Sequence, residues 1–254
     1  MPHDAAIRGQ GARSSAPGPP ESGSSPRGAV GGQGARPSVP LARRLVQLYA
    51  GLVLYGASGA LILLAGLGAD PWDVLHQGLS RRIGLGTGAW VCIVGALVLL
   101  LWIPLRQKPG FGTVSNVIVI GVVMDIALAL FDPASGPVTR GALLTAGVLL
   151  NGVATGLYIG ARLGPGPRDG LMTGLAARGH SLRAVRTAIE LTVLAAGALL
   201  GGTVGIGTVA YALAIGPLAH VFVPLLALPD PPPRRTRPAV ALPPSGAPQP
   251  APAP

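Results

Sequence analysis

The stretch LGADPWDVLHQGL, residues 67–79, returns with few changes as LGPGPRDGLMTGL, residues 163–175. Both copies fit the pattern L-G-x-x-P-x-D-x-L-x-x-G-L, and each copy follows a long apolar run. A motif written twice at a fixed offset indicates an internal duplication.

The duplication extends well beyond this motif. The segment GFGTV, residues 110–114, is matched by GIGTV, residues 205–209. Residues 43–130 and 139–228 are therefore predicted to be two copies of one structural unit.

The composition indicates a membrane protein. The chain has 254 residues, of which 49% are hydrophobic and 11% charged, whereas a soluble domain carries about 25% charged residues. The apolar residues occur in runs of roughly twenty, the length that a helix needs to cross the hydrocarbon core of a bilayer. We expect an all-α membrane protein that contacts the lipid bilayer.

Each unit is predicted to contain three membrane spans and one short helix. The predicted spans are residues 43–66, 86–105, 112–130, 140–162, 182–203 and 207–228. Residues 71–82 and 167–178 are too short to span, so each is predicted to form a short helix at, or dipping into, one membrane face. Asp70 and Pro71 are typical of a helix start.

The positive charges predict the orientation. If the N-terminus is cytoplasmic, only Arg81, Arg82 and Arg140 of the 19 Lys and Arg residues fall in outer segments, as the positive-inside rule requires. Both termini are then cytoplasmic. Because three spans is an odd number, the second unit must be inverted relative to the first.

The two ends of the chain have a different composition. Residues 1–40 are rich in Gly, Pro, Ser and Arg and are predicted to be disordered. Residues 229–254 form a Pro-rich segment that is predicted to be extended and flexible. Both are predicted to be cytoplasmic tails.

Asp73 and Asp169 are the foremost candidate site residues, since each is near the third position of a short helix. They are either structural helix caps or a symmetric pair of acidic gates at the two mouths of a path. Trp72 in the first copy, a candidate membrane-interface anchor, is replaced by Arg168 in the second. Arg168 could pair with Asp169 or attract an anion, and His76 is predicted to lie on the surface.

Further ionisable residues lie inside the predicted spans. Asp125 and His220 occupy equivalent positions, where they could relay protons or reach out to the membrane surface. Arg186 and Glu190 are four residues apart and can pair on one helix face, for packing or for function. Polar residues that could hydrogen-bond between helices are Asn116, Asn151 and Thr155.

The sequence contains no P-loop, dinucleotide fingerprint, HExxH or metal-ligand cluster. Cys92 is the one cysteine, so no disulfide framework is expected. The net charge of +10 comes from arginines beside the apolar runs and in the tails, which indicates topology rather than nucleic-acid binding. We expect neither an enzyme nor a bound cofactor or metal.

Three runs give the chain a family resemblance: residues 66–88, 110–125 and 162–175. In these runs the chain resembles the YczE/YyaS/YitT-type family of bacterial integral membrane proteins, and most of all the YczE branch. The resemblance covers residues 43–228. It implies a multi-pass protein of the bacterial cell membrane, and it carries over no activity, substrate, cofactor or catalytic residue.

Two functional hypotheses remain open from the sequence. Inverted repeats with short interrupted helices are typical of secondary transporters and some channels, which favours passage of a small solute or a proton. The alternative is a non-transporting membrane scaffold or accessory protein. Such a protein would bind a protein partner that the sequence does not name.

Overall fold

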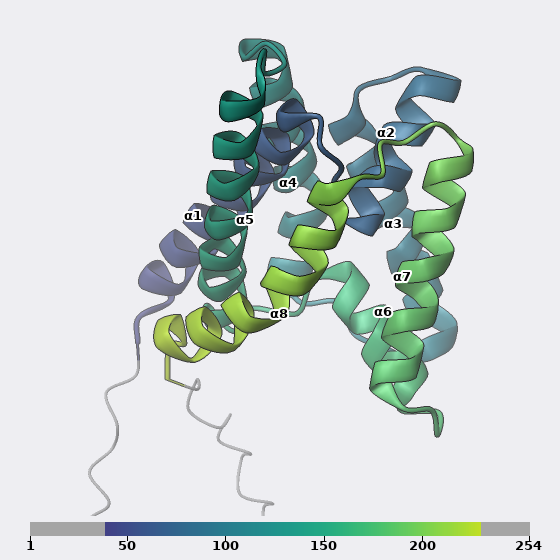
Figure 1. Ribbon diagram of the computed structural model, residues 1–254. Helices are drawn as coiled ribbons and strands as arrows, with labels where there is room; N and C mark the ends of the chain where they lie inside the picture. Colours follow the sequence, from purple (N-terminus) through teal and green to yellow (C-terminus); the bar gives the residue numbers. More distant parts are fainter. Residues whose placement is uncertain (1–38, 230–254) are drawn as a thin grey trace, which may run out of the picture. The chain divides into compact units, whose positions relative to one another are not determined.

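The computed structural model describes residues 39–229 as eight helices joined by loops, with no strand in that range. The all-helical fold class predicted from the sequence is confirmed. The tails predicted at residues 1–40 and 229–254 lie almost wholly outside the described residues. The helices are α1 (Leu41–Ala65), α2 (Pro71–Ile83), α3 (Thr87–Leu105), α4 (Phe111–Leu130), α5 (Pro137–Gly160), α6 (Pro167–Ala176), α7 (Leu182–Leu199) and α8 (Ile206–Leu226) (Figure 1).

Five of the helices in residues 39–229 are long and apolar enough to cross a membrane: α1, α3, α4, α5 and α8. The sequence predicts six spans, so the predicted spans and the candidate spans of the structure differ at α7. This helix has only 18 residues, and Arg183, Arg186 and Glu190 give it three charges. Length and composition alone therefore do not identify α7 as a span.

The helix starts follow the internal repeat. α5 and α6 begin 96 residues after α1 and α2, and α7 and α8 begin 95 residues after α3 and α4. The predicted helix start at Asp70 is confirmed, because its carboxylate accepts hydrogen bonds from the backbone N–H groups of Trp72, at 2.9 Å, and Asp73, at 3.3 Å. Pro71 takes the first helical position, where no donor is lost.

The L-G-x-x-P-x-D motif of each copy packs against the G-x-G-T segment of the other copy. The N–H of Gly207 donates to the carbonyl of Leu67 at 2.8 Å, and the N–H of Gly112 donates to the carbonyl of Leu163 at 2.9 Å. A Cβ on Gly68 would lie 2.6 Å from the Gly205 nitrogen, so only glycine fits there. The L-G of each copy thus docks on the G-x-G-T of the other.

The remaining packing combines contacts between the copies with contacts within each copy. α1 and α5 lie against each other, while α4 packs on α1 and α8 packs on α5. Likewise α2 packs on α7, and α3 packs on α6. Glycines allow the backbones to approach: a Cβ at Gly51 would lie 2.7 Å from the Tyr158 nitrogen, and one at Gly147 would lie 2.7 Å from a side-chain carbon of Ile62.

One helix pair breaks this symmetry. α3 and α4 are in close contact, and a Cβ at Gly121 would overlap the carbonyl oxygen of Gly88. The equivalent helices α7 and α8 diverge instead (Figure 1). Gly216, the counterpart of Gly121, would have no atom within 4 Å of an added Cβ. The second copy therefore leaves an opening where the first copy is closed.

Candidate functional site: a cavity between the two copies

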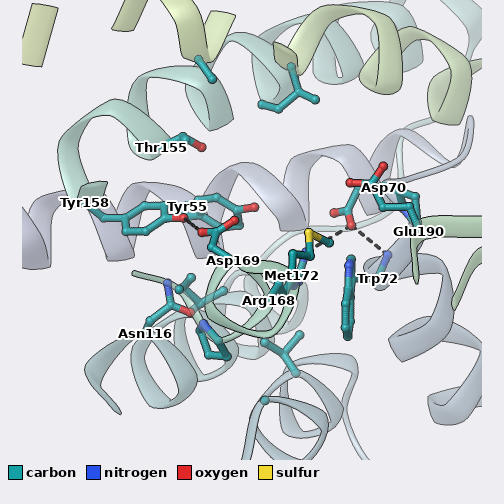
Figure 2. Close-up of a pocket in the computed structure, with 18 of the residues that line it drawn as sticks. Tyr55, Asp70, Trp72, Asn116, Thr155, Tyr158, Arg168, Asp169, Met172 and Glu190 are labelled. Carbon is teal, nitrogen blue, oxygen red and sulfur yellow. Dashed lines mark hydrogen bonds and ion pairs between the residues drawn. The ribbon is translucent and has the colours of Figure 1, made fainter. Parts of the chain in front are cut away.

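A cavity of about 400 Å³ lies among α3, α4, α7 and α8, with α1 and α5 contributing to its wall (Figure 2). Both copies of the repeat supply lining residues. Arg186 and Glu190 of α7 and Gly216 and His220 of α8 belong to the wall. Because Arg186 and His220 are exposed, the cavity opens between these two diverging helices.

The first turns of both short helices line this cavity. Arg168 at the start of α6 connects them. One guanidinium nitrogen lies 3.4 Å from a carboxylate oxygen of Asp70, and the other lies 3.9 Å from Asp73. The guanidinium carbon also lies 5.1 Å from the centre of the Trp72 ring, within cation–π range.

Asp73 and Asp70 are buried beside this arginine and outside the spanning helices. The Nδ1 of His76, only 2% exposed, lies 3.2 Å from Asp73. Burial and the nearby Arg168 lower the pKa of His76 to about 3, so the imidazole is neutral and its Nδ1–H donates. Burial and the nearby Asp73 raise the pKa of Asp70 to about 7, although Arg168 opposes this shift.

Asp169 has a different environment from its counterpart Asp73. The hydroxyl of Tyr158 donates to its Oδ2 at 3.0 Å. Among residues 39–229 no cation lies within ion-pair distance of this carboxylate. The N-cap of α6 is Gly166, which offers no side-chain cap, whereas Asp70 caps α2.

Aromatic and amide groups complete the wall. Three of the chain's four tyrosines line the cavity: Tyr55, Tyr158 and Tyr211. The rings of Tyr55 and Tyr158 meet edge to face, with centroids 5.9 Å apart. Trp72 is 6% exposed, and its indole N–H has no hydrogen-bond partner in the described part of the chain.

A polar chain ties α1, α5 and α8 together beside the cavity. The Tyr211 hydroxyl donates to Asn151 at 3.0 Å, and the Asn151 amide donates to the Ser58 hydroxyl at 2.9 Å. The predicted interhelical role of Asn151 is confirmed. Thr155 instead donates to the Asn151 carbonyl on its own helix, and Asn116 lines the cavity.

Residues 42–224 match the protein family described as "Family of unknown function (DUF6198)". The chain belongs to this family. It is also 34% identical over 180 residues to the "Uncharacterized membrane protein YczE" of Bacillus subtilis, an alignment that covers 69% of this chain and 83% of the relative. The resemblance to the YczE branch is confirmed.

Two other relatives extend this comparison. An "Uncharacterized protein" of Haemophilus influenzae is 39% identical over 177 residues, covering 69% of this chain and 81% of the relative. The "Uncharacterized protein YyaS" of Bacillus subtilis is 28% identical over 186 residues, an alignment that covers 69% of this chain and 90% of the relative. No solved structure matches the chain.

In this member of the DUF6198 family, Asp73 and Asp169 have different surroundings, and their role as a pair of acidic gates stays a prediction. Arg168, the sequence neighbour of Asp169, lies 3.9 Å from Asp73, whereas Asp169 itself contacts Tyr158. Pairing with Asp169, one of the two roles left open for Arg168, is not observed, because its guanidinium contacts Asp70 and Asp73. The helix-capping role considered for Asp73 is taken by Asp70.

His76, predicted to lie on the surface, and Trp72, considered as a membrane-interface anchor, are both buried. His76 is 2% exposed and bonds to Asp73, and Trp72 is 6% exposed beneath Arg168. For Trp72 the sequence alone misled because Arg168, which lies over its ring, comes from the distant second copy. The tyrosines of the cavity were also missed, although hydroxyl-bearing rings within apolar runs could have signalled them.

Asp125 and His220 are not brought together. Asp125 accepts from the backbone N–H groups of Gly88 and Ala89, at 2.6 and 2.9 Å, and so caps the start of α3. The Nδ1 of His220 lies 2.9 Å from the Gly216 carbonyl on its own helix. The predicted pair of Arg186 and Glu190 is present, with 2.9 Å between its charged atoms.

Proposed function

We propose that this chain moves a small solute across the bacterial cell membrane, as a transporter or channel, through the cavity between its two copies. The cavity carries the proposal, because it places carboxylates and guanidinium groups inside a bundle of apolar helices. Ionisable groups are costly within a membrane, and in membrane proteins they commonly mark substrate or ion paths. The proposal assigns the chain no enzymatic step.

The proposed topology has six spans in two inverted repeats, with both termini cytoplasmic. α7 serves as the sixth span, and its Arg186–Glu190 pair offsets two of its three charges. α2 and α6 then enter from opposite membrane faces, and their first turns meet at Arg168. The exchange of hydrogen bonds between the copies supports this arrangement, since Gly207–Leu67 and Gly112–Leu163 are equivalent pairs.

The difference between the two equivalent helix pairs supports alternating access. α3 and α4 close one side of the cavity, whereas α7 and α8 leave the other side open. Inverted repeats allow a transporter to exchange these two conformations around a fixed central site. In this proposal, opening of α3–α4 accompanies closing of α7–α8.

Uptake into proteoliposomes with an imposed proton gradient tests the proposal. The purified full chain is supplied with separate radiolabelled amines, carboxylates and neutral solutes. We expect uptake of at least one class, and at least a tenfold loss in Asp169→Asn, because Asp169 lines the cavity. Asp132→Asn is the matched control, since Asp132 is exposed and outside the cavity wall.

Failure of every solute class to move would contradict transport. So would an Asp169→Asn variant that alters only the amount of protein and leaves the uptake per molecule unchanged. Either result would favour the scaffold or accessory role.

A further inference from the structure

We infer that the ligand of this cavity is a small organic amine that also carries a hydroxyl or carbonyl oxygen, with its ammonium group at Asp169 and its oxygen at the Trp72 indole N–H. This inference rests on the proposed function of the cavity as a solute site, and it names the class of solute.

The balance of charges around the cavity calls for a cation. Arg186 pairs with Glu190 at 2.9 Å, and Arg168 serves both Asp70 and Asp73. The remaining carboxylate is Asp169, whose contact within residues 39–229 is the neutral hydroxyl of Tyr158. The Asp169 side chain is partly buried. Arg186 acts on it electrostatically at longer range, but no cation pairs with it directly among residues 39–229. An ammonium group on the ligand would supply this direct partner.

An anionic ligand fits the same surroundings less well. The start of α6 has no side-chain cap at Gly166, and such a helix end attracts negative charge. Asp169 in the first turn already supplies that charge. The guanidinium of Arg168 already pairs with two carboxylates. An added anion would therefore be repelled by Asp169, and Arg168 would not be available to pair with it.

The aromatic lining also suits an ammonium group. Aromatic residues make up 4% of the chain, yet Tyr55, Tyr158, Tyr211 and Trp72 all line this one cavity. The electron-rich faces of such rings attract cations. Arg168 already makes this contact with Trp72, at 5.1 Å from the ring centre.

The unpartnered indole N–H adds a second requirement. The Nε1 of Trp72 is buried and has no acceptor among the described residues, and a buried unsatisfied donor is destabilising. An acceptor oxygen on the ligand would satisfy it. Figure 2 places Asp169 and Trp72 apart, with Met172 between them, so the two groups belong at opposite ends of the ligand.

The size of the cavity limits the ligand. A volume of about 400 Å³ is near the lower end of the range of roughly 300–1,000 Å³ for small-molecule sites. The site therefore suits a short amine rather than a large lipophilic cation.

Calorimetric binding to the full chain in lipid nanodiscs tests this inference with three probes of matched length: aminohexanol, hydroxyhexanoate and hexanediol. These are a cation, an anion and a neutral molecule, and each has a hydroxyl for Trp72. We expect only aminohexanol to bind. Asp169→Asn should weaken its binding at least tenfold, and Trp72→Phe should weaken it by roughly 2- to 12-fold, the equivalent of one hydrogen bond. Asp132→Asn should leave binding unchanged.

Other outcomes overturn the inference. These are tighter binding of hydroxyhexanoate or hexanediol, no binding of aminohexanol, or an unchanged affinity in both Asp169→Asn and Trp72→Phe. Thermal unfolding checks that each variant is folded. If Asp169→Asn fails to fold, Asp169→Glu replaces it, and this variant must retain the preference for the amine.

The binding test and the uptake test can fail separately. Binding of aminohexanol with no uptake of any solute would contradict transport and leave the amine site standing. Uptake of a carboxylate or a neutral solute, with no binding of aminohexanol, would contradict the amine assignment and leave transport standing.

Discussion

Asp125 and His220 show how one residue can make two equivalent helix pairs behave differently. The carboxylate of Asp125 on α4 caps the start of α3 through two backbone N–H groups. His220, its counterpart on α8, contacts a carbonyl of its own helix. The start of α7, whose N-cap is Ser181, has no side-chain cap among residues 39–229. This difference accompanies the closed α3–α4 pair and the open α7–α8 pair.

Replacing each of these residues with alanine tests the capping role. Asp125→Ala should lower the free energy of unfolding by about 0.5–2 kcal/mol, the usual cost of losing a helix cap. His220→Ala should change it little, because the His220 side chain is exposed and bridges no second helix. Chemical denaturation in detergent measures both variants. Equal losses in the two variants would contradict the assignment.

Some residue-level features could be predicted because they are local. The Asp70–Pro71 helix start and the Arg186–Glu190 pair depend on neighbours within four residues, and both are present. The burial of Trp72 could not be predicted in this way. It depends on Arg168, which lies 96 residues along the chain.

At the scale of the helices, glycine positions distinguish packed from open surfaces. Gly121 on α4 and Gly216 on α8 are equivalent in the repeat. Gly121 lies against the backbone of Gly88, whereas Gly216 faces open space. The same residue type therefore has a structural role in one copy, and in the other it leaves room at the opening of the cavity.

Alanine at these two glycines gives a matched comparison. Gly121→Ala should destabilise the protein by about 1–3 kcal/mol, as overpacking does. Gly216→Ala should be neutral or slightly stabilising, because alanine favours helix more than glycine by about 1 kcal/mol. Thermal unfolding in detergent measures both. A larger loss in Gly216→Ala than in Gly121→Ala would show that α7–α8 is the closed pair.

The order and the starts of the helices could be predicted from apolar runs and from the doubled motif. The prediction that residues 182–203 span the membrane is not matched by the length and composition of α7, because this helix is short and carries three charges. Its pairing with α2 comes from glycine contacts that have no periodic signal. A Cβ at Gly197, for example, would lie 2.5 Å from the backbone nitrogen of Leu75.

At the scale of the whole chain, the doubled motif joins the two copies. Leu67 and Gly68 dock on residues 205–208, and Leu163 and Gly164 dock on residues 110–113. Each copy therefore completes the other. This reciprocal contact explains why L-G-x-x-P-x-D and G-x-G-T are both written twice, and it sets the first turns of α2 and α6 beside one cavity.

The orientation of the two copies is the central claim, and cysteine labelling tests it most directly. Arg81→Cys and Arg178→Cys are made separately in a Cys92→Ser background, which removes the one native cysteine. Arg81 is at the end of α2, and Arg178 follows α6. The two positions are nearly equivalent in the repeat, and both are exposed.

In intact cells, a membrane-impermeant maleimide should label position 81, and it should label position 178 only after the membrane is permeabilised. This result would place the two short helices on opposite faces. Equal labelling of both positions in intact cells, or protection of both until permeabilisation, would place them on the same face and contradict the inverted repeat.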